Sequence, residues 1–269
     1  MTMTARHAGP GERAGHYRFR NVARMEWIKL RSLRSTWWML VVTVGGATAM
    51  AVVIGVNTRN RAGDLTNNAL AGVVPGLLLT GVLGVLVMTS EYTSGMIRAT
   101  LAAVPRRGLM LTAKAAVFGL VALAAGEAAA VISFAAGGAA LQHGITAPAL
   151  TQPGVLRAVL LAGASFGLVG LLGLGLGAIV RHTAAAIAVL VGGVYLAAQF
   201  VGVVAQGAAG YMPVLIIGNS LTTTKPQTCP PHAALCPHFL SAWAGLGMLC
   251  LYAAVVLGIG AWLLARRDA

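Results

Sequence analysis

The chain has 269 residues, of which 58% are hydrophobic and only 9% are charged, and its mean hydropathy is +0.81. Soluble domains carry about 25% charged residues, so this composition excludes a water-soluble globule. The formal net charge of +13 bears on orientation across a bilayer rather than on nucleic acid, which we do not expect as a partner.

Arginine far outnumbers lysine, and alanine and glycine dominate the apolar residues. This bias is typical of GC-rich bacterial coding. We therefore expect a multi-pass protein of the inner or plasma membrane of a bacterium.

Residues 1–19 are polar and basic and contain no apolar core, which predicts a disordered cytoplasmic tail and no cleavable signal. Residues 20–35 are predicted to form an amphipathic helix in the membrane interface. The alternative is a plain basic flank without a defined helix. Apolar residues recur there at helical spacing, namely Val22, Met25 and Ile28, with Trp27, Leu30 and Leu33 beside them. The residues expected at the membrane interface are Trp27, Lys29, Arg31, Arg34, Trp37 and Trp38.

Six segments hold the roughly 20 mostly apolar residues that a spanning helix needs. They are residues 36–56, 71–90, 109–141, 155–180, 184–205 and 241–265. Continuous apolar runs of this length form helices, because only helices satisfy their own backbone hydrogen bonds in lipid. The predicted fold is an all-α membrane protein with a six-helix domain over 36–265 and a short tail over 266–269. The first turns of the third span, around Lys114, are expected at the interface.

Orientation follows from the basic residues. With a cytoplasmic N-terminus, the outside holds only Arg59, Arg61, Arg157 and Lys225, and every other arginine and lysine lies inside. This is the bias of the positive-inside rule. Both termini and the connection 91–108 are therefore predicted to be cytoplasmic.

The connection 91–108 carries a short helical pattern over 93–104. Ile97, Leu101 and Val104 share one stripe, and Pro105 ends the pattern. One interpretation is a solvated loop that satisfies the positive-inside rule. The other is an amphipathic helix whose stripe rests on lipid or docks into a groove of a soluble partner.

These residues resemble a family motif. Glu91, Gly95, Ile97, Leu101 and Pro105 followed by Arg106 are similar to the E-x-x-x-G-x-(apolar)-x-x-x-L-x-x-x-P-x-R signature of ABC-2-type permeases, the membrane subunits of one class of ATP-binding-cassette exporters. The stretch MEWIKLRSLRSTWW resembles the connecting helix that precedes the first span in that family. The resemblance implies a coupling helix between spans two and three, seated on a nucleotide-binding subunit. The coupling residues it implies are Glu91, Gly95, Ile97, Arg98, Leu101, Pro105, Arg106 and Arg107.

The resemblance also implies the function. A permease subunit of this kind exports a hydrophobic or amphipathic substrate, drug-like or lipid-like, and pairs with a second permease copy or paralogue. None of Lys29, Lys114 and Lys225 ends a G-x-x-x-x-G-K-[ST] phosphate loop. ATP and Mg²⁺ are therefore expected on a separate ATPase subunit, with no cofactor on this chain and no enzyme activity of its own. The alternative is an autonomous secondary transporter or channel, which predicts inverted repeats and broken, charged helices.

Two polar residues fall within the predicted spans. Glu127 lies deep in the third span and lines a translocation path, or is protonated and bonded to a backbone carbonyl or a neighbouring serine. Gln199 in the fifth span is a weaker candidate, because glutamine readily bonds between helices as a structural contact. The pairs Gly163–Gly167 and Gly173–Gly177 indicate close helix packing.

Residues 206–240 form the predicted extracellular loop. Its MPVLIIG portion is too short to span and is expected to be re-entrant or interfacial. Cys229 and Cys236 lie on the oxidising side and are predicted to form a disulfide. The nearby His232 and His238 leave a metal site as the less favoured alternative, so no metal is expected.

Overall fold

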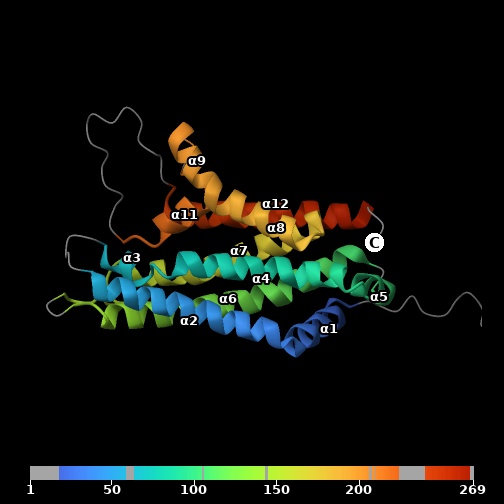
Figure 1. Cartoon of the computed structure of the whole chain (residues 1–269), viewed down its shortest axis with the longest axis horizontal. Helices are drawn as coiled ribbons and strands as arrows, with labels where there is room; N and C mark the ends of the chain where they lie inside the picture. Colours follow the sequence, from blue (N-terminus) through green and yellow to red (C-terminus); the bar gives the residue numbers. More distant parts are fainter. Residues whose placement is uncertain are drawn as a thin grey trace, which may run out of the picture.

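The computed structural model describes residues 18–58, 64–104, 106–142, 145–205, 208, 210–223 and 240–266. Throughout these ranges the chain is a bundle of helices without a β-strand (Figure 1). Five helices are long and apolar enough to cross a membrane: α2 (Arg34–Asn57), α4 (Val73–Thr93), α6 (Arg107–Ala139), α7 (Val155–Val180) and α12 (Ala242–Arg266). The predicted all-α fold class is confirmed, and these five helices match five of the six predicted spans.

Helix α7 is the centre of the bundle. It buries 72% of its most apolar segment, whereas α12 buries only 22%. The crossing of α4 and α7 depends on glycine, because a Cβ on Gly173 would overlap the carbonyl oxygen of Gly81 and a Cβ on Gly84 would overlap that of Gly170. Such close backbone approach is what small residues allow between helices in lipid. The predicted glycine packing therefore operates within one chain.

Helix α1 (Phe19–Ser32) is separate from α2, because Leu33 leaves the helical region at φ −84° and ψ 101°. The predicted helix over 20–35 is therefore present as α1, and its apolar residues lie on two sides. The buried side of α1 consists of Val22, Glu26 and Leu30, while Ile28 is 58% exposed. The exposed Trp27 and Ile28 leave an apolar side free, so the interface location stays a prediction, and the inward side has a carboxylate at its middle.

The predicted fifth span, residues 184–205, is not one regular helix. It divides into α8 (Thr183–Leu190), a π-helix η1 (Val191–Leu196) and α9 (Ala197–Val204). Helix α8 packs against α4 and α7, with Leu190 fully buried, and α9 leans away from the other helices (Figure 1). Gly192 and Gly193 lie in η1 with nothing within 4 Å of a built Cβ. Glycine weakens a regular helix and tight packing is missing here, which explains why this segment departs from the prediction.

Two short helices lie at one end of the bundle, α3 (Leu65–Ala69) and α11 (Pro213–Ser220). The carboxylate of Asp64 caps α3 and also accepts hydrogen bonds from the backbone nitrogen and the hydroxyl of Thr223. Helix α11 has eight residues, so the MPVLIIG stretch is a short helix, as its length required. Cys229, Cys236, His232 and His238 lie outside the described residues, and the disulfide stays a prediction.

The opposite end of the bundle holds α1, α5 (Met96–Ala103) and the last turn of α12 (Figure 1). We call it the basic end, because most described basic residues belong to the helix termini and connections there. They are Arg18, Arg20, Arg24, Lys29, Arg31, Arg34, Arg98, Arg106, Arg107, Lys114, Arg181 and Arg266. At the far end the described residues include Arg157, which donates to the carbonyl of Thr222 at 2.8 Å.

Candidate functional site

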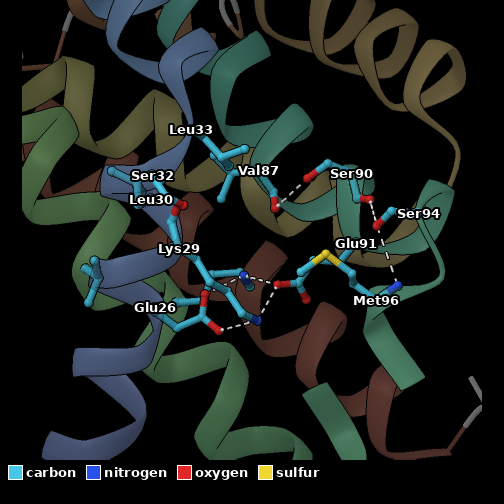
Figure 2. A pocket seen from close by; sticks show the side chains of 12 residues that line it. Glu26, Lys29, Leu30, Ser32, Leu33, Val87, Ser90, Glu91, Ser94 and Met96 are labelled. Carbon is cyan, nitrogen blue, oxygen red and sulfur yellow. Dashed lines mark hydrogen bonds and ion pairs between the residues drawn. The ribbon is translucent and has the colours of Figure 1, made fainter. Parts of the chain in front are cut away.

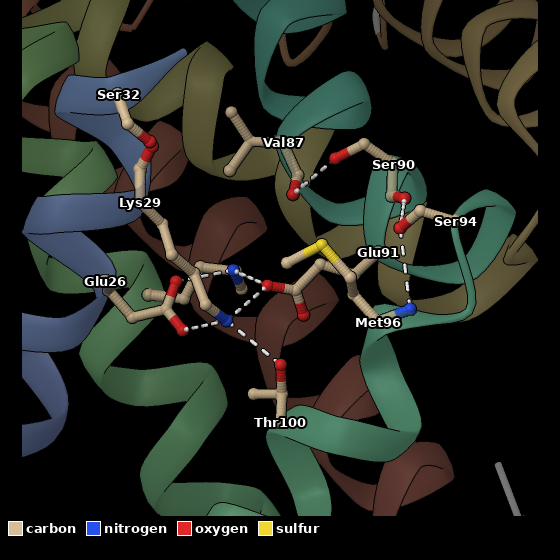
Figure 3. A network of polar contacts seen from close by, with 10 residues as sticks. Glu26, Lys29, Ser32, Val87, Ser90, Glu91, Ser94, Met96 and Thr100 are labelled. Carbon is tan, nitrogen blue, oxygen red and sulfur yellow. Dashed lines mark hydrogen bonds and ion pairs between the residues drawn. The ribbon is translucent and has the colours of Figure 1, made fainter.

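Four charged side chains from three helices meet inside the basic end (Figure 3). Lys114 Nζ on α6 lies 2.6 Å from Glu26 Oε2 on α1 and 2.8 Å from Glu91 Oε1 on α4. Lys29 Nζ on α1 lies 3.0 Å from Glu91 Oε1 and 3.4 Å from Glu26 Oε1. We call these four residues the ion network.

The ion network is neutral and mostly withdrawn from solvent. The side chains of Glu26, Glu91 and Lys114 are 4%, 6% and 4% exposed, and only Lys29 is more open, at 25%. A buried charge without a partner is costly, and two carboxylates matched by two ammonium groups remove that cost only while all four are present. The three helices are therefore held to one another by groups that cannot be lost singly.

Local helix geometry explains how these residues converge. Glu26 and Lys29 are one turn apart on α1, which places them on neighbouring positions of one face. Glu91 lies in the last turn of α4 and Lys114 in the second turn of α6. The short connection between those two helices brings both side chains to the same level.

Helix α5 is tied to the ion network by one hydrogen bond. Lys29 Nζ donates to the hydroxyl of Thr100 at 3.0 Å, and Thr100 is only 5% exposed (Figure 3). Ile97 and Val104, each 4% exposed, lie on the same side of α5. They pack in one apolar cluster with Val22 of α1, Met88 of α4 and Met110 of α6.

This packing corrects the interpretation of the α5 stripe. Ile97 and Val104 were expected to rest on lipid or to enter a partner's groove, but they are buried in the chain's own core, with Leu101 partly buried beside them. The connection is short and its apolar side chains are within reach of three helix ends, so burial inside the chain competes successfully with an external surface. Gly95 starts α5 with φ 70°, a left-handed conformation that favours glycine.

The other predicted coupling residues lie in different surroundings. Arg98 and Arg106 are exposed. Arg107 is partly buried, and its Nη1 donates to the carbonyl of Leu264 at 2.9 Å, which joins the start of α6 to the end of α12. Pro105 lies outside the described residues.

The residues predicted at the membrane interface divide into two groups. Trp27, Trp37 and Trp38 are 41%, 43% and 69% exposed, and Arg31 and Arg34 are exposed as well. Lys29 instead turns inward and belongs to the ion network.

Sequence reasoning placed Lys29 and Glu91 in separate groups, put Lys114 at the interface and gave Glu26 no role in the site. The structure brings all four together. One signal could have found Glu26, since it is the one carboxylate in a helix otherwise rich in arginine. Nothing in the sequence states which lysine it meets.

A cavity of about 340 Å³ adjoins the ion network (Figure 2). It lies between α1 and α4, with Leu33 and Val87 on facing elements. The remaining wall is a mixture of apolar and hydroxyl side chains, namely Leu30, Ser32, Ser90, Ser94, Met96 and Val117. The space leaves α1 and α4 joined mainly through the charged groups rather than by direct packing.

Glu127 and Gln199, the two candidates for the translocation path, lie on different helices, and the structure describes no contact between them. Glu127 is half-buried on α6 and faces α7, where a Cβ on Gly163 would overlap its carboxylate. Its carboxylate accepts no hydrogen bond from a described residue. The backbone of Gln199 belongs to α9, and its side chain lies outside the description.

Over the described ranges, no group of three or more His, Cys, Asp or Glu side chains could hold a metal ion. Comparison of the sequence with protein-family models and with curated proteins finds no match. The family resemblance therefore rests on the motif residues and the helix pattern of this chain.

Proposed function

We propose that the chain is the transmembrane permease subunit of an ABC-2-type exporter in a bacterial cell membrane. It moves a hydrophobic or amphipathic substrate outward, driven by ATP hydrolysis on a separate nucleotide-binding subunit. The observation that carries the proposal is the attachment of α5, the predicted coupling helix, to the ion network through Thr100 and Lys29.

This attachment supports a role in transmitting motion. Helix α5 contacts α1 through Lys29 and shares an apolar cluster with α1, α4 and α6. Packed side chains and buried ion pairs carry displacement between elements as discrete rearrangements rather than as gradual deformation. A partner that pushes on α5 would therefore move the ends of α1, α4 and α6 together.

The path of the chain supports six crossings with both termini on one side. Helix α7 ends beside the end of α4, where Thr183 Oγ1 donates to Thr89 Oγ1 at 2.9 Å. The next helix, α12, starts near α11 at the opposite end of the bundle (Figure 1). The unit of α8, η1 and α9 makes this return, and its 22 residues at 1.5 Å each span about 33 Å, the thickness of a bilayer core.

Exposed apolar surface supports a lipid environment and a paired subunit. Helices α2 and α6 each bury only 28% of their most apolar segment within the chain. In a bilayer the remaining surface contacts acyl chains or a second permease. The substrate path of such a pair lies between the two subunits, where Glu127 and Gln199 remain candidate lining residues.

The test is co-purification. The full chain, tagged at its C-terminus and expressed in its own host, should retain an ATPase with a phosphate-binding loop in mild detergent. Reconstituted transport should stop when that loop's lysine is replaced. Transport by the purified chain alone, driven by an ion gradient, would establish the secondary transporter instead.

A further inference from the structure

The cavity between α1 and α4 has a charged floor and an exposed rim (Figure 2). The floor consists of Glu26, Glu91 and Lys114 from the ion network, whose side chains are at most 6% exposed. At the rim Leu33 and Met96 are each 47% exposed. Methionine is unbranched and flexible, so the rim can adapt to a group that enters. The cavity therefore connects the surface of the basic end with a buried carboxylate.

One oxygen of the Glu91 carboxylate lacks a hydrogen-bond donor. Its Oε1 accepts from Lys29 at 3.0 Å and from Lys114 at 2.8 Å. No described residue donates to its Oε2, which is buried, and Glu91 as a whole is only 5% exposed. A buried acceptor without a donor is costly, because it has lost its hydrogen bonds to water. A ligand in the cavity that supplied a donor would remove this cost.

The other polar groups around the cavity offer acceptors rather than donors. Ser32, Ser90 and Ser94 each donate their hydroxyl hydrogen to a backbone carbonyl three or four residues earlier in the chain. Their hydroxyl oxygens therefore keep only lone pairs for a ligand. Lys29 uses its three ammonium hydrogens within the ion network and on α5. The cavity consequently calls for a ligand that brings its own hydrogen-bond donor.

The charges of the ion network favour a neutral donor. Its four charges sum to zero, and two ammonium groups already contact Glu91 Oε1. A cationic ligand would add an unmatched positive charge beside Lys29 and Lys114, and an ionised carboxylate or phosphate would place a second anion against Glu91. A hydroxyl group is neutral and donates one hydrogen. Its lone pairs also suit the third hydrogen of Lys114, which donates the other two to Glu26 and Glu91.

The rest of the cavity suits the apolar part of an amphiphile. Leu33 and Val87 lie on facing elements and give it apolar walls. One turn after Leu33, Trp37 and Trp38 are 43% and 69% exposed, and tryptophan is enriched at the head-group level of a membrane. The volume of about 340 Å³ is at the small end of ligand pockets. It suits a small head group with the start of its chain rather than a whole lipid.

We propose that this cavity binds the head group of a neutral, hydroxyl-bearing lipid of the acylglycerol type. A head-group hydroxyl donates to Glu91 Oε2, and the acyl chain leaves between Leu33 and Val87 toward the bilayer. The bound lipid fills the space between α1 and α4 and joins them by direct packing. The inference goes beyond the proposed function and does not depend on an ATPase partner, because it needs only the cavity and a surrounding membrane.

The experiment uses the full chain in nanodiscs of phosphatidylcholine, whose head group carries no hydrogen-bond donor. The probe is a monoacylglycerol with a photoreactive diazirine near its ester group. Irradiation should label peptides that contain Leu33, Val87 or Val117, and this labelling should saturate. Unlabelled monoolein should compete. Methyl oleate, which has no hydroxyl, and oleylamine, which is cationic, should each compete about tenfold less well at equal mole fraction, because they leave the buried acceptor unpaired or add a charge.

Filling the cavity provides the matched variant. Val87→Phe should lower labelling at Leu33 and Val117 about tenfold by occupying the space. Ser94→Phe, at an exposed position of the same cavity, should give the same block and replaces Val87→Phe if that variant unfolds. The control is Val41→Phe on α2, where the side chain is 59% exposed and does not line the cavity. It should be labelled like the wild type.

Three outcomes would overturn the inference. Labelling that does not saturate, or that is as strong at the exposed Val41 as at Leu33, would mean that the probe only dissolves in the bilayer. Equal competition by methyl oleate would show that the hydroxyl is not recognised, and stronger competition by oleylamine would show a cationic ligand. The result is distinguishable from a failure of the proposed function, since a chain that retains no ATPase should still bind the probe.

Discussion

Replacing Lys114 by methionine tests the ion network directly. Methionine preserves most of the side-chain volume and removes the ammonium group that lies 2.6 Å from Glu26 and 2.8 Å from Glu91. Both carboxylates then share Lys29, whose contacts are longer and whose side chain is 25% exposed. One buried carboxylate is left without compensation.

Breaking a buried ion pair by removing one partner costs about 3–5 kcal/mol. At 1.4 kcal/mol per factor of ten, this corresponds to roughly two to three and a half orders of magnitude in the unfolding equilibrium. We expect Lys114→Met to lower the free energy of unfolding by about this amount. The measurement is a reversible sodium dodecyl sulfate titration in mixed micelles, followed by tryptophan fluorescence.

The double variant Glu26→Gln with Lys114→Met should recover part of the loss, because it leaves Lys29 and Glu91 as a balanced pair. Coupling between close charge pairs is about 1.5 kcal/mol or more. Arg24→Met, a surface cation of the same end, should change stability by less than about 0.5 kcal/mol. A Lys114→Met protein as stable as the Arg24→Met protein, or a cycle without coupling, would refute the reasoning.

Three further substitutions test backbone and packing predictions in the same titration. Gly173→Ala should cost about 1–3 kcal/mol, because its Cβ would overlap the carbonyl oxygen of Gly81. Gly95→Ala should cost about 1–2 kcal/mol, because φ is 70° there although nothing lies within 4 Å. Gly163→Ala should be destabilising through overlap with the Glu127 carboxylate, and adding Glu127→Ala should restore stability.

Each of these has a control within the chain. Gly192→Ala, at a helical glycine with nothing within 4 Å, should be neutral or stabilising by up to about 1 kcal/mol. Gly95→Asn should lose less than Gly95→Ala, since asparagine tolerates the left-handed region. A Gly173→Ala protein as stable as Gly192→Ala would contradict the close crossing of α4 and α7. A Gly163→Ala loss that Glu127→Ala leaves unchanged would contradict the contact between these two residues.

Hydropathy and spacing predicted much of the fold, because each spanning helix is specified by its own residues. A run of about 20 apolar residues must be helical in lipid wherever it lies in the chain. The same local logic located α1 ahead of Trp37 and the short α11 at the MPVLIIG stretch. It missed the π-helix in 184–205, because poor packing around Gly192 and Gly193 is not visible in composition.

The candidate site depended on contacts that sequence alone does not determine. Lys114 and Glu26 are 88 positions apart, and Lys29 and Glu91 are 62 apart. Composition and the motif singled out Glu91 and Lys29 for different reasons, and only the packing of α1 against α6 brought Lys29 within reach of Glu91 on α4.

The sequence by itself determined an all-helical, lipid-facing chain with its positive charge gathered on the connections of one side, since hydropathy and charge belong to each segment alone. The tertiary structure decided which side of α5 is free. An amphipathic pattern states that a helix has two sides, but the neighbours available at the bundle end decide which side is buried. Here Val22, Met88 and Met110 cover the apolar side, and the arginines are left outside.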